Sequence, residues 1–196
     1  RRMGRSNTRA SFRELLQAAR SAISDLAVST DMMVGFPGES AAEFQQSLEF
    51  AESMAFARMH IFRYSRRAGT PAADMPAQVP ASVAKQRSRR MHSLDARMQT
   101  QFRRRFVGRK MDVLWERAQA HGDGVRWSGL TPNYLRVVTD TDDAVNLHNV
   151  VTETAMLAAV EEGLLGEVQP RAAPVESTLG SALQHPHQMY PQPAGQ

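Results

Sequence analysis

The sequence contains no cysteine among its 196 residues, and this absence excludes several kinds of site. Without a thiol, these residues form no disulfide, hold no metal through thiolates and supply no cysteine nucleophile. The chain also lacks any apolar run close to the roughly 18 residues that a membrane-spanning helix needs. Its first 12 residues contain no hydrophobic targeting segment. We therefore expect a soluble, cytoplasmic protein.

Acidic residues are scarce in residues 85–110, although the net charge of the whole chain is only +4. Asp95 is the one acid in this stretch. The basic residues there are Lys85, Arg87, Arg89, Arg90, Arg97, Arg103, Arg104, Arg105, Arg109 and Lys110. Such a cluster suits a polyanion such as nucleic acid, whose phosphates attract cations and release counterions on binding. A solvated helix face would carry the same charges, and charge alone leaves both interpretations open.

Residues 1–80 show a repeated helix and strand pattern. Apolar spacing predicts helices over 11–24 and 40–55, each opened by a capping box, Ser11 with Glu14 and Ser40 with Glu43. Residues 26–34 and 57–65 alternate as strands do. This order predicts parallel strands, but two of them make no complete barrel. We therefore expect residues 1–80 to be part of a larger barrel and the chain, which lacks a start Met, to be a fragment.

The second half of the chain changes in pattern twice. Residues 81–107 predict a basic connecting helix with Met91, Leu94, Met98 and Phe102 on one face, preceded by an extended connection over 68–80. Residues 108–168 contain short alternating segments split by turns, which predicts a small antiparallel barrel. Residues 169–196 are rich in Pro and Gln and are predicted to be disordered, with His185 and His187 a poor candidate metal site.

The first candidate site is the turn "VGFPGE", which follows the first strand. Ligands of parallel α/β sheets lie at the carboxyl ends of the strands, and the two glycines permit close backbone approach. The turn matches neither a phosphate loop nor a dinucleotide fingerprint, so an ordinary strand-to-helix turn is the more frequent explanation. Asp31, in the middle of the strand, is expected to be buried and to need a partner.

The second candidate site follows the second strand, in "HIFRYSRRAGT". It combines cations, an aromatic ring and a hydroxyl in Arg63, Tyr64, Ser65, Arg66 and Arg67. This mixture suits a nucleotide, although a basic strand end on the surface would look the same. In the predicted barrel, Tyr134 and Arg136 are two residues apart and are expected on one face of a strand. With Trp127 they would form an RNA-binding surface, or the two aromatic residues would fill the barrel core.

Three segments together resemble the C-terminal half of the radical-SAM methylthiotransferases: "STDMMVGFPGESAAEFQQSLEF", "HIFRYSRRAGTPAADMPAQVP" and "RRRFVGRKMDVL". The resemblance runs in order from "RRMGRSNT" to "GLLGEV", which is nearly the whole chain except its tail. The region 108–168 is similar to a TRAM domain, the RNA-binding module that ends these enzymes. The implied fold class is α/β plus β, with a partial radical-SAM (β/α) barrel followed by a small antiparallel TRAM-like barrel.

The resemblance implies an activity that this chain lacks on its own. Family members hold a [4Fe–4S] cluster on a C-x-x-x-C-x-x-C motif, cleave S-adenosylmethionine to a radical and insert a methylthio group into their substrate. A second cluster takes part in sulfur delivery. All of these cysteines would precede Arg1, so the chain is expected to be inactive in isolation and to need a missing N-terminal half. A non-catalytic RNA-binding protein, or a remnant without the cluster domain, is the alternative.

Residue roles follow from the same resemblance. The turn residues Gly35, Phe36, Pro37, Gly38 and Glu39 are expected on the cofactor side of the barrel. Arg63, Tyr64, Ser65, Arg66 and Arg67 are expected to face the substrate nucleoside. A more distant set is expected to hold the anticodon region of tRNA: Arg103, Arg104, Arg105, Arg109, Lys110 and Arg136.

The family has three substrate branches. They modify isopentenyl-adenosine beside the anticodon, threonylcarbamoyl-adenosine at the same position, or an aspartate of a ribosomal protein. The ribosomal branch tends to carry acids where Arg66 and Arg67 stand, which favours tRNA. The segment "MHIFRYSRRAGTPAADMPAQVP" most resembles the threonylcarbamoyl-adenosine branch, although Arg63 stands where a proline is common. The sequence therefore predicts that branch.

Overall fold

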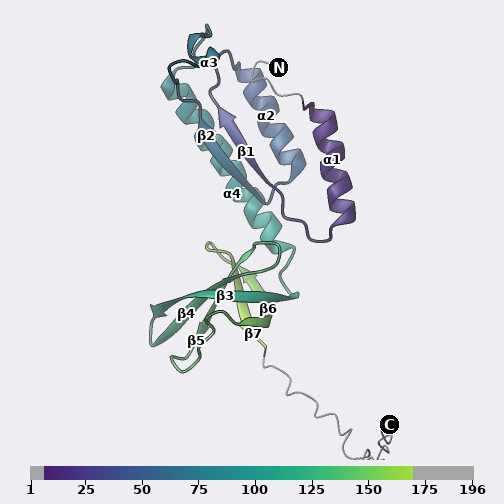
Figure 1. Cartoon of the computed structure of the whole chain (residues 1–196), viewed down its shortest axis with the longest axis vertical. Coiled ribbons are helices and arrows are strands. Elements are labelled where there is room, and N and C mark those ends of the chain that lie inside the picture. The colour runs from purple at the N-terminus through teal and green to yellow at the C-terminus, as the bar shows by residue number, and fades with distance from the viewer. Residues whose placement is uncertain (1–6, 170–196) are drawn as a thin grey trace, which may run out of the picture.

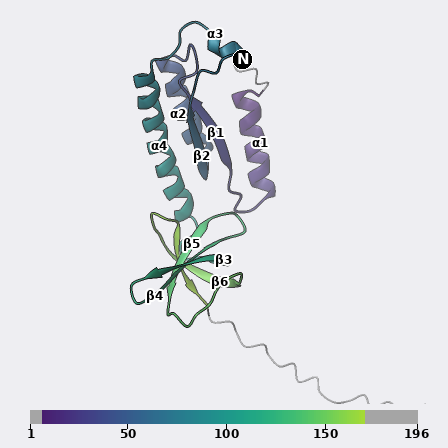
Figure 2. The same ribbon diagram turned by 60° about the vertical axis from the view of Figure 1, so that its left-hand side comes forward.

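The structure is a computed structural model and describes residues 7–169. An α/β part and a β-barrel lie at opposite ends of an elongated molecule, and helix α4 runs from one to the other (Figure 1, Figure 2). The α/β part contains α1 Arg9–Ala22, β1 Ser29–Val34, α2 Ala41–Met54, β2 Arg58–Arg63, α3 Pro71–Asp74 and α4 Ala81–Arg104. The barrel contains β3 Lys110–His121, β4 Gly124–Leu130, β5 Arg136–Thr141, β6 Val151–Ala159 and β7 Leu164–Val168. The predicted disorder of the tail, with His185 and His187, concerns residues beyond Gln169 that lie outside the described range.

The two predicted capping boxes have different outcomes. Helix α2 begins after Ser40, whose hydroxyl accepts the amide of Glu43 while that carboxylate accepts the amide of Ser40, as predicted. Helix α1 begins after Thr8, not Ser11. The Thr8 hydroxyl accepts the Ser11 amide at 3.1 Å, and the Ser11 hydroxyl accepts the Thr8 amide at 3.0 Å. A serine thus takes the place that glutamate usually has in this motif, and the helix begins before the predicted residue.

Strands β1 and β2 form a two-stranded parallel sheet, as predicted. Val34 and Met59 point to the helices and are buried in a core with residues of α1, α2 and α4. The opposite face is exposed along both strands, from Ser29 and Arg58 at one end to Met33 and Phe62 at the other. The sheet therefore has one packed and one open face.

Helix α4 belongs to two cores. Met91, Leu94 and Met98 pack in the α/β core, whereas Phe102 packs in the barrel core, so the predicted apolar face is confirmed as a buried face. The same face carries Asp95, which is buried but accepts hydrogen bonds from the Met59 amide and the Gln99 side chain, both at 2.7 Å. Satisfying the carboxylate in this way makes its burial tolerable. The connection before α4 contains the short helix α3, where an extended segment was predicted.

The barrel is closed in the order β3-β4-β5-β7-β6, with β3 and β6 paired to complete it. Its pairings are antiparallel except for β5 with β7, which is parallel, so the prediction of an antiparallel barrel is correct for all pairs but one. Trp115 fills the centre with no exposed surface, and its indole Nε1 donates to the Thr152 hydroxyl at 2.8 Å. The overall class is mixed α/β plus β, as predicted.

Polar contacts fix the α/β part against the barrel. Arg103 at the end of α4 donates to the carbonyls of Val160 and Glu161, each at 3.0 Å. On the other side, the Arg109 guanidinium contacts both carboxylate oxygens of Asp25, which lies in the loop after α1. Asn133 of the barrel donates to the Asp25 carbonyl at 2.9 Å. These contacts come from two separate segments of the α/β part, and together they define its orientation relative to the barrel.

Candidate nucleic-acid interface

The turn after β1 is stabilised by its own atoms. Gly35 and Gly38 have φ values of 77° and 75°, which side chains other than hydrogen rarely permit. The Gly35 amide donates to Glu39 Oε2 at 2.5 Å, the Gly38 amide to the Ala77 carbonyl at 2.8 Å, and the Glu39 amide to the Phe36 carbonyl at 2.9 Å. The amides of Gly35, Gly38 and Glu39 are therefore already used within the protein.

Helix α4 holds this turn closely. Arg87 donates to the Glu39 carboxylate at 2.7 Å and to its carbonyl at 2.9 Å, and the two side chains are only 10% and 12% exposed. A Cβ on Gly35 would lie 2.8 Å from Ala84 Cβ. These contacts explain why the sequence needs so tight a turn here: the strand end passes directly against the helix. The presence of Gly35 and Glu39, and of the buried Pro37, is therefore explained by a structural role. The predicted role of the turn in cofactor binding stays a prediction.

Four of the five residues predicted to face the substrate line one groove. Arg63, Tyr64, Ser65 and Arg67 surround a groove of about 460 Å³ at the carboxyl ends of the strands. Met33 and Phe62, which were not predicted as site residues, are the large apolar residues of the lining. Their alternation along the strands was the available signal. Arg66 lies outside the lining, exposed, with Asp74 at 3.9 Å.

Tyr64 is the most constrained residue of this groove. Its amide donates to the Val34 carbonyl at 2.8 Å, and its ring meets Phe36 edge to face at 5.5 Å. Its hydroxyl is buried, and within the described part of the chain it has no hydrogen-bond partner. A buried hydroxyl without a partner is costly in a folded protein, so a bound group that accepts or donates a hydrogen bond there would be favoured.

Several arginines predicted to hold tRNA have structural partners instead. Arg103 and Arg109 make the contacts between the two parts, and Lys110 pairs with Glu153 at 2.9 Å. Arg105 lies over the ring of Phe102 at 5.2 Å. Arg104 and Arg136 are exposed, and no hydrogen bond or ion pair occupies the guanidinium of either within residues 7–169. The basic cluster is therefore divided between structural and available cations.

The Asp25 and Arg109 pair shifts the ionisation of both groups. The hydrogen bond from Arg109 lowers the pKa of the Asp25 carboxyl below its usual value, and the same bond raises the pKa of the guanidinium. In the barrel, the Arg126 hydrogen bond likewise lowers the pKa of Asp140. Both acids are therefore charged at neutral pH and locally offset the basic charge of the chain.

Two predictions about single side chains are wrong, and a third, left open between two alternatives, is decided for one residue. Asp31 is exposed, because it lies on the open face of the sheet, opposite His60 in the register. Tyr134 and Arg136 do not share a strand, since Tyr134 lies in the turn before β5. Trp127 is buried in the barrel core, whereas Tyr134 is exposed. The core interpretation therefore applies to Trp127 alone.

None of the helices within residues 7–169 is both long and apolar enough to cross a membrane. No cluster of three or more histidine, aspartate or glutamate side chains in that range has a metal-binding arrangement.

Comparison with known proteins gives a consistent group of relatives, although no family model matches the chain. The chain is 36% identical over 173 residues, 87% of its length, to the tRNA-2-methylthio-N(6)-dimethylallyladenosine synthase of Streptomyces griseus subsp. griseus. It is 41% identical over 143 residues, 73% of its length, to the protein of that name from Erythrobacter litoralis. It is 37% identical over 163 residues, 81% of its length, to the protein of that name from Thermobifida fusca.

These matches cover 34%, 32% and 33% of the relatives, so the chain spans about a third of their length. The predicted threonylcarbamoyl-adenosine branch is not supported, because all three names specify dimethylallyladenosine. The segment that suggested the other branch, residues 59–80, supplies most of the lining of the strand-end groove. Over most of its length, the chain is thus similar to one third of a tRNA methylthiotransferase of the dimethylallyladenosine type.

Proposed function

We propose that this chain is part of a tRNA methylthiotransferase that adds a methylthio group to a dimethylallyl-adenosine next to the anticodon. The observation that carries the proposal is the similarity over 73–87% of the chain to proteins named for that reaction. The groove of Arg63, Tyr64, Ser65 and Arg67 supports it, because cations and an aromatic ring at strand ends suit a nucleoside and its phosphates. Met33 and Phe62 suit the apolar dimethylallyl group.

The chain does not itself fit the iron–sulfur cluster that the resemblance implies. It has no cysteine to supply a thiolate ligand. In the proposed enzyme, the thiolates that hold the cluster would come from residues other than these, and the cluster and S-adenosylmethionine would supply the radical. The role of the Gly35–Glu39 turn on the cofactor side stays a prediction. The residues of this chain would orient the nucleoside and hold the tRNA. An RNA-binding protein without catalysis is the second candidate, favoured by the same lack of cysteine.

The test is the content of methylthio nucleosides in tRNA from the source cells, with the gene intact and deleted. We expect deletion to remove 2-methylthio-dimethylallyl-adenosine, detected by mass spectrometry of digested tRNA, and to leave 2-methylthio-threonylcarbamoyl-adenosine unchanged. The reverse pattern would restore the branch first predicted. Unchanged amounts of both would exclude the enzymatic proposal and leave the RNA-binding candidate.

A second test addresses the substrate residues. Replacing Arg66 and Arg67 by glutamate should weaken tRNA binding and flatten its dependence on salt, because each phosphate contact contributes to that slope. The control replaces both Arg90 and Arg97 by glutamate, which makes the same change of four charges at two exposed arginines on the helical side. Equal losses in the control would mean that only net charge matters and would contradict the assigned roles.

A further inference from the structure

An aliphatic row lies on the outer surface of the barrel, where β6, β3 and β4 pair side by side. Val151 of β6 faces Leu114 of β3 in the register, and Leu114 faces Leu130 of β4. Residues directly opposite each other in antiparallel strands share a face of the sheet. The neighbours of Leu114 along its strand, Val113 and Trp115, are fully buried, so this face points away from the core. We call Val151, Leu114 and Leu130 the aliphatic row.

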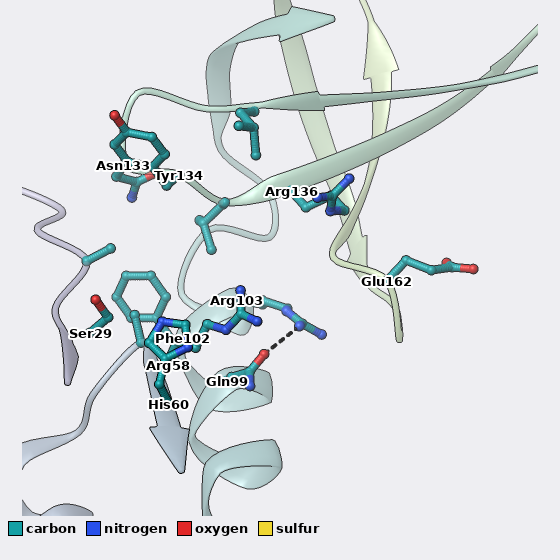
Figure 3. A pocket seen from close by; sticks show the side chains of 14 residues that line it. Ser29, Arg58, His60, Gln99, Phe102, Arg103, Asn133, Tyr134, Arg136 and Glu162 are labelled. Carbon is teal, nitrogen blue, oxygen red and sulfur yellow. Dashed lines mark hydrogen bonds between the residues drawn. The ribbon is translucent and has the colours of Figure 1, made fainter. Parts of the chain in front are cut away.

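The row is open to solvent at its β6 end. Val151 is 60% exposed and Leu114 40%, and Val150, next to the row, is 41% exposed. At the β4 end the row stops at Arg136, which faces Leu130 in the register and lines the groove between the barrel and the parallel sheet (Figure 3). Contiguous exposed aliphatic side chains, unlike single ones, indicate contact with another segment.

The chain leaves the barrel beside this row. Strand β7 runs antiparallel to β6, and at its end the Gln169 amide donates to the Glu153 carbonyl at 3.0 Å. Strand β7 therefore heads along β6 toward Val151, which lies two residues, or about 7 Å, beyond Glu153. Pro170 follows and has no amide to continue the ladder. Residues 170–196 thus begin close to the aliphatic row.

The residues that follow contain a short apolar segment. In residues 170–183 the only charged side chains are Arg171 and Glu176. The large aliphatic residues there recur every four positions: Val175, Leu179 and Leu183. This spacing places side chains on one face of a helix. Anchors spaced in this way are typical of segments that bind an apolar surface.

A tethered segment suits the size of the row better than a separate partner does. Complexes between separate proteins bury roughly 800 Å² on each side, far more than three aliphatic side chains offer. A segment joined by a short linker has an effective concentration in the millimolar range, so a small contact is enough. The linker 170–174 spans up to about 17 Å when extended, which exceeds the distance of about 7 Å from Glu153 to Val151.

The charges beside the row fit the same segment. Asp112 faces Glu153 in the register, and both side chains are exposed on the face that carries the row. Glu153 pairs with Lys110 at 2.9 Å, whereas no ion pair involves Asp112 within residues 7–169. Arg171, the first charged residue after β7, is within reach of Asp112. The two acids also disfavour a phosphate backbone on this face.

We propose that residues 175–183 of this chain cover the aliphatic row and that Arg171 pairs with Asp112 at its edge. The aliphatic side chains of the segment and of the row are then removed from water together. Because the contact is intramolecular, the coverage of the row does not depend on protein concentration. The inference concerns a surface outside the strand-end groove and does not depend on the proposed function.

The absence of cysteine makes the row directly testable, because one introduced thiol is the only one in the 196-residue chain. Val151→Cys places a thiol in the row, and its rate of alkylation by N-ethylmaleimide measures the exposure of that position. Leu179→Asp combined with Leu183→Asp removes the apolar face of the segment. We expect these two changes to raise the alkylation rate at least about fivefold, as for a row that is covered roughly 80% of the time.

Leu157→Cys is the matched control for the thiol. Leu157 lies on the same strand and is 50% exposed, but it lies outside the row. Its alkylation rate should be unaffected by the two aspartate substitutions.

Arg171→Glu tests the pair with Asp112 separately. It should raise the alkylation rate of the Val151→Cys variant about twofold at 0.1 M salt. The increase should be smaller at about 0.5 M salt, because salt screens exposed charges.

Equal alkylation rates of the Val151→Cys variant with and without the two aspartate substitutions would overturn the inference. Protection that grows with protein concentration would assign the row to a second copy of the chain and would also overturn it. An equal rise in rate for the Leu157→Cys variant would mean that the substitutions expose the whole strand, which contradicts coverage of the row. None of these outcomes bears on the methylthio nucleosides that test the proposed function.

Discussion

Each strand of the barrel is hydrogen-bonded to two neighbours, whereas β1 and β2 in the α/β part have only each other in the described chain. The barrel therefore satisfies its backbone with its own residues and has no open edge. The parallel sheet has two open edges and one exposed face that carries Met33 and Phe62, 43% and 52% exposed. A two-stranded sheet gains its stability from what packs on it, and here the helices cover one face only.

The difference shows how one chain can combine a module that satisfies its own backbone with a sheet whose stability depends on the helices packed against it. In the α/β part, stability comes from α4, which crosses from one core to the other and anchors the strand-end turn through Arg87. In the barrel, it comes from strand closure around Trp115. Variants in the two regions should therefore fail in different ways.

The largest effect is expected at the barrel centre. Trp115→Ala removes a fully buried indole and its hydrogen bond to Thr152, so the free energy of unfolding should fall by about 3–5 kcal/mol. Urea unfolding followed by circular dichroism would measure it. Leu157→Ala, at a position 50% exposed on β6, should change stability by less than about 0.5 kcal/mol. A small effect of Trp115→Ala would refute the view that the barrel is a tightly packed module.

The next effect concerns the buried ion pair of the α/β part. Arg87→Met leaves the Glu39 carboxylate buried without its cation and should cost about 3 kcal/mol. Arg97→Met breaks the exposed pair with Glu52, whose side chains are 61% and 64% exposed, and should cost less than about 1 kcal/mol. Similar losses in the two variants, measured by the same urea titration, would mean that the turn is not anchored through Arg87.

A pair of glycines sharpens the comparison between turn strain and close packing. Gly35 and Gly69 have φ values of 77° and 78°, but a Cβ would meet Ala84 only at Gly35. Gly69→Ala should therefore cost about 1 kcal/mol from backbone strain alone, and Gly35→Ala about 2 kcal/mol or more. The difference between their unfolding free energies reports the contact with α4. Equal values would show that the helix moves away freely.

The smallest effect is expected at the junction of the two parts. Because the pKa of Asp25 is lowered by Arg109, its contribution to stability is present above the ordinary carboxyl pKa of 3.8 and is lost as pH falls through the lower folded value. Asp25→Asn should remove this pH dependence of stability. At neutral pH it should also broaden the range of orientations between the α/β part and the barrel, which small-angle X-ray scattering would measure. An unchanged scattering curve would mean that the Arg103 contacts and the hydrogen bond from Asn133 to the Asp25 carbonyl fix the junction without the Asp25 side chain.

Local patterns in the sequence predicted the elements of the fold well, but not its long-range contacts. The Ser40 capping box, the alternation in both strands and the apolar face of α4 are each set by neighbouring residues, and each is confirmed. The parallel pairing of β5 with β7 was missed, because Val137 and Leu164 meet only when the barrel closes. The exposure of Asp31 was missed because the sheet has an open face, which the alternation does not reveal.

The candidate site was predictable in composition and not in geometry. The strand-end groove gathers four of the five expected residues because they are consecutive in sequence. Several of the basic residues make contacts with distant partners that the sequence does not reveal, such as Arg109 with Asp25 and Lys110 with Glu153. The groove between the barrel and the parallel sheet is lined by Arg58 and Arg136, which are far apart in the chain, and only the folded arrangement brings them together.

The pairing of β7 with both β5 and β6 has a consequence for protein synthesis. The barrel cannot close until Leu164–Val168 has left the ribosome, long after β3 at Lys110–His121 has emerged. At about 5–20 residues per second, the unpaired strands wait for several seconds. During that interval their edges are open to pairing with neighbouring nascent chains. Slow translation of this stretch should therefore lower the yield of folded protein through aggregation more than slow translation of the helical residues before it.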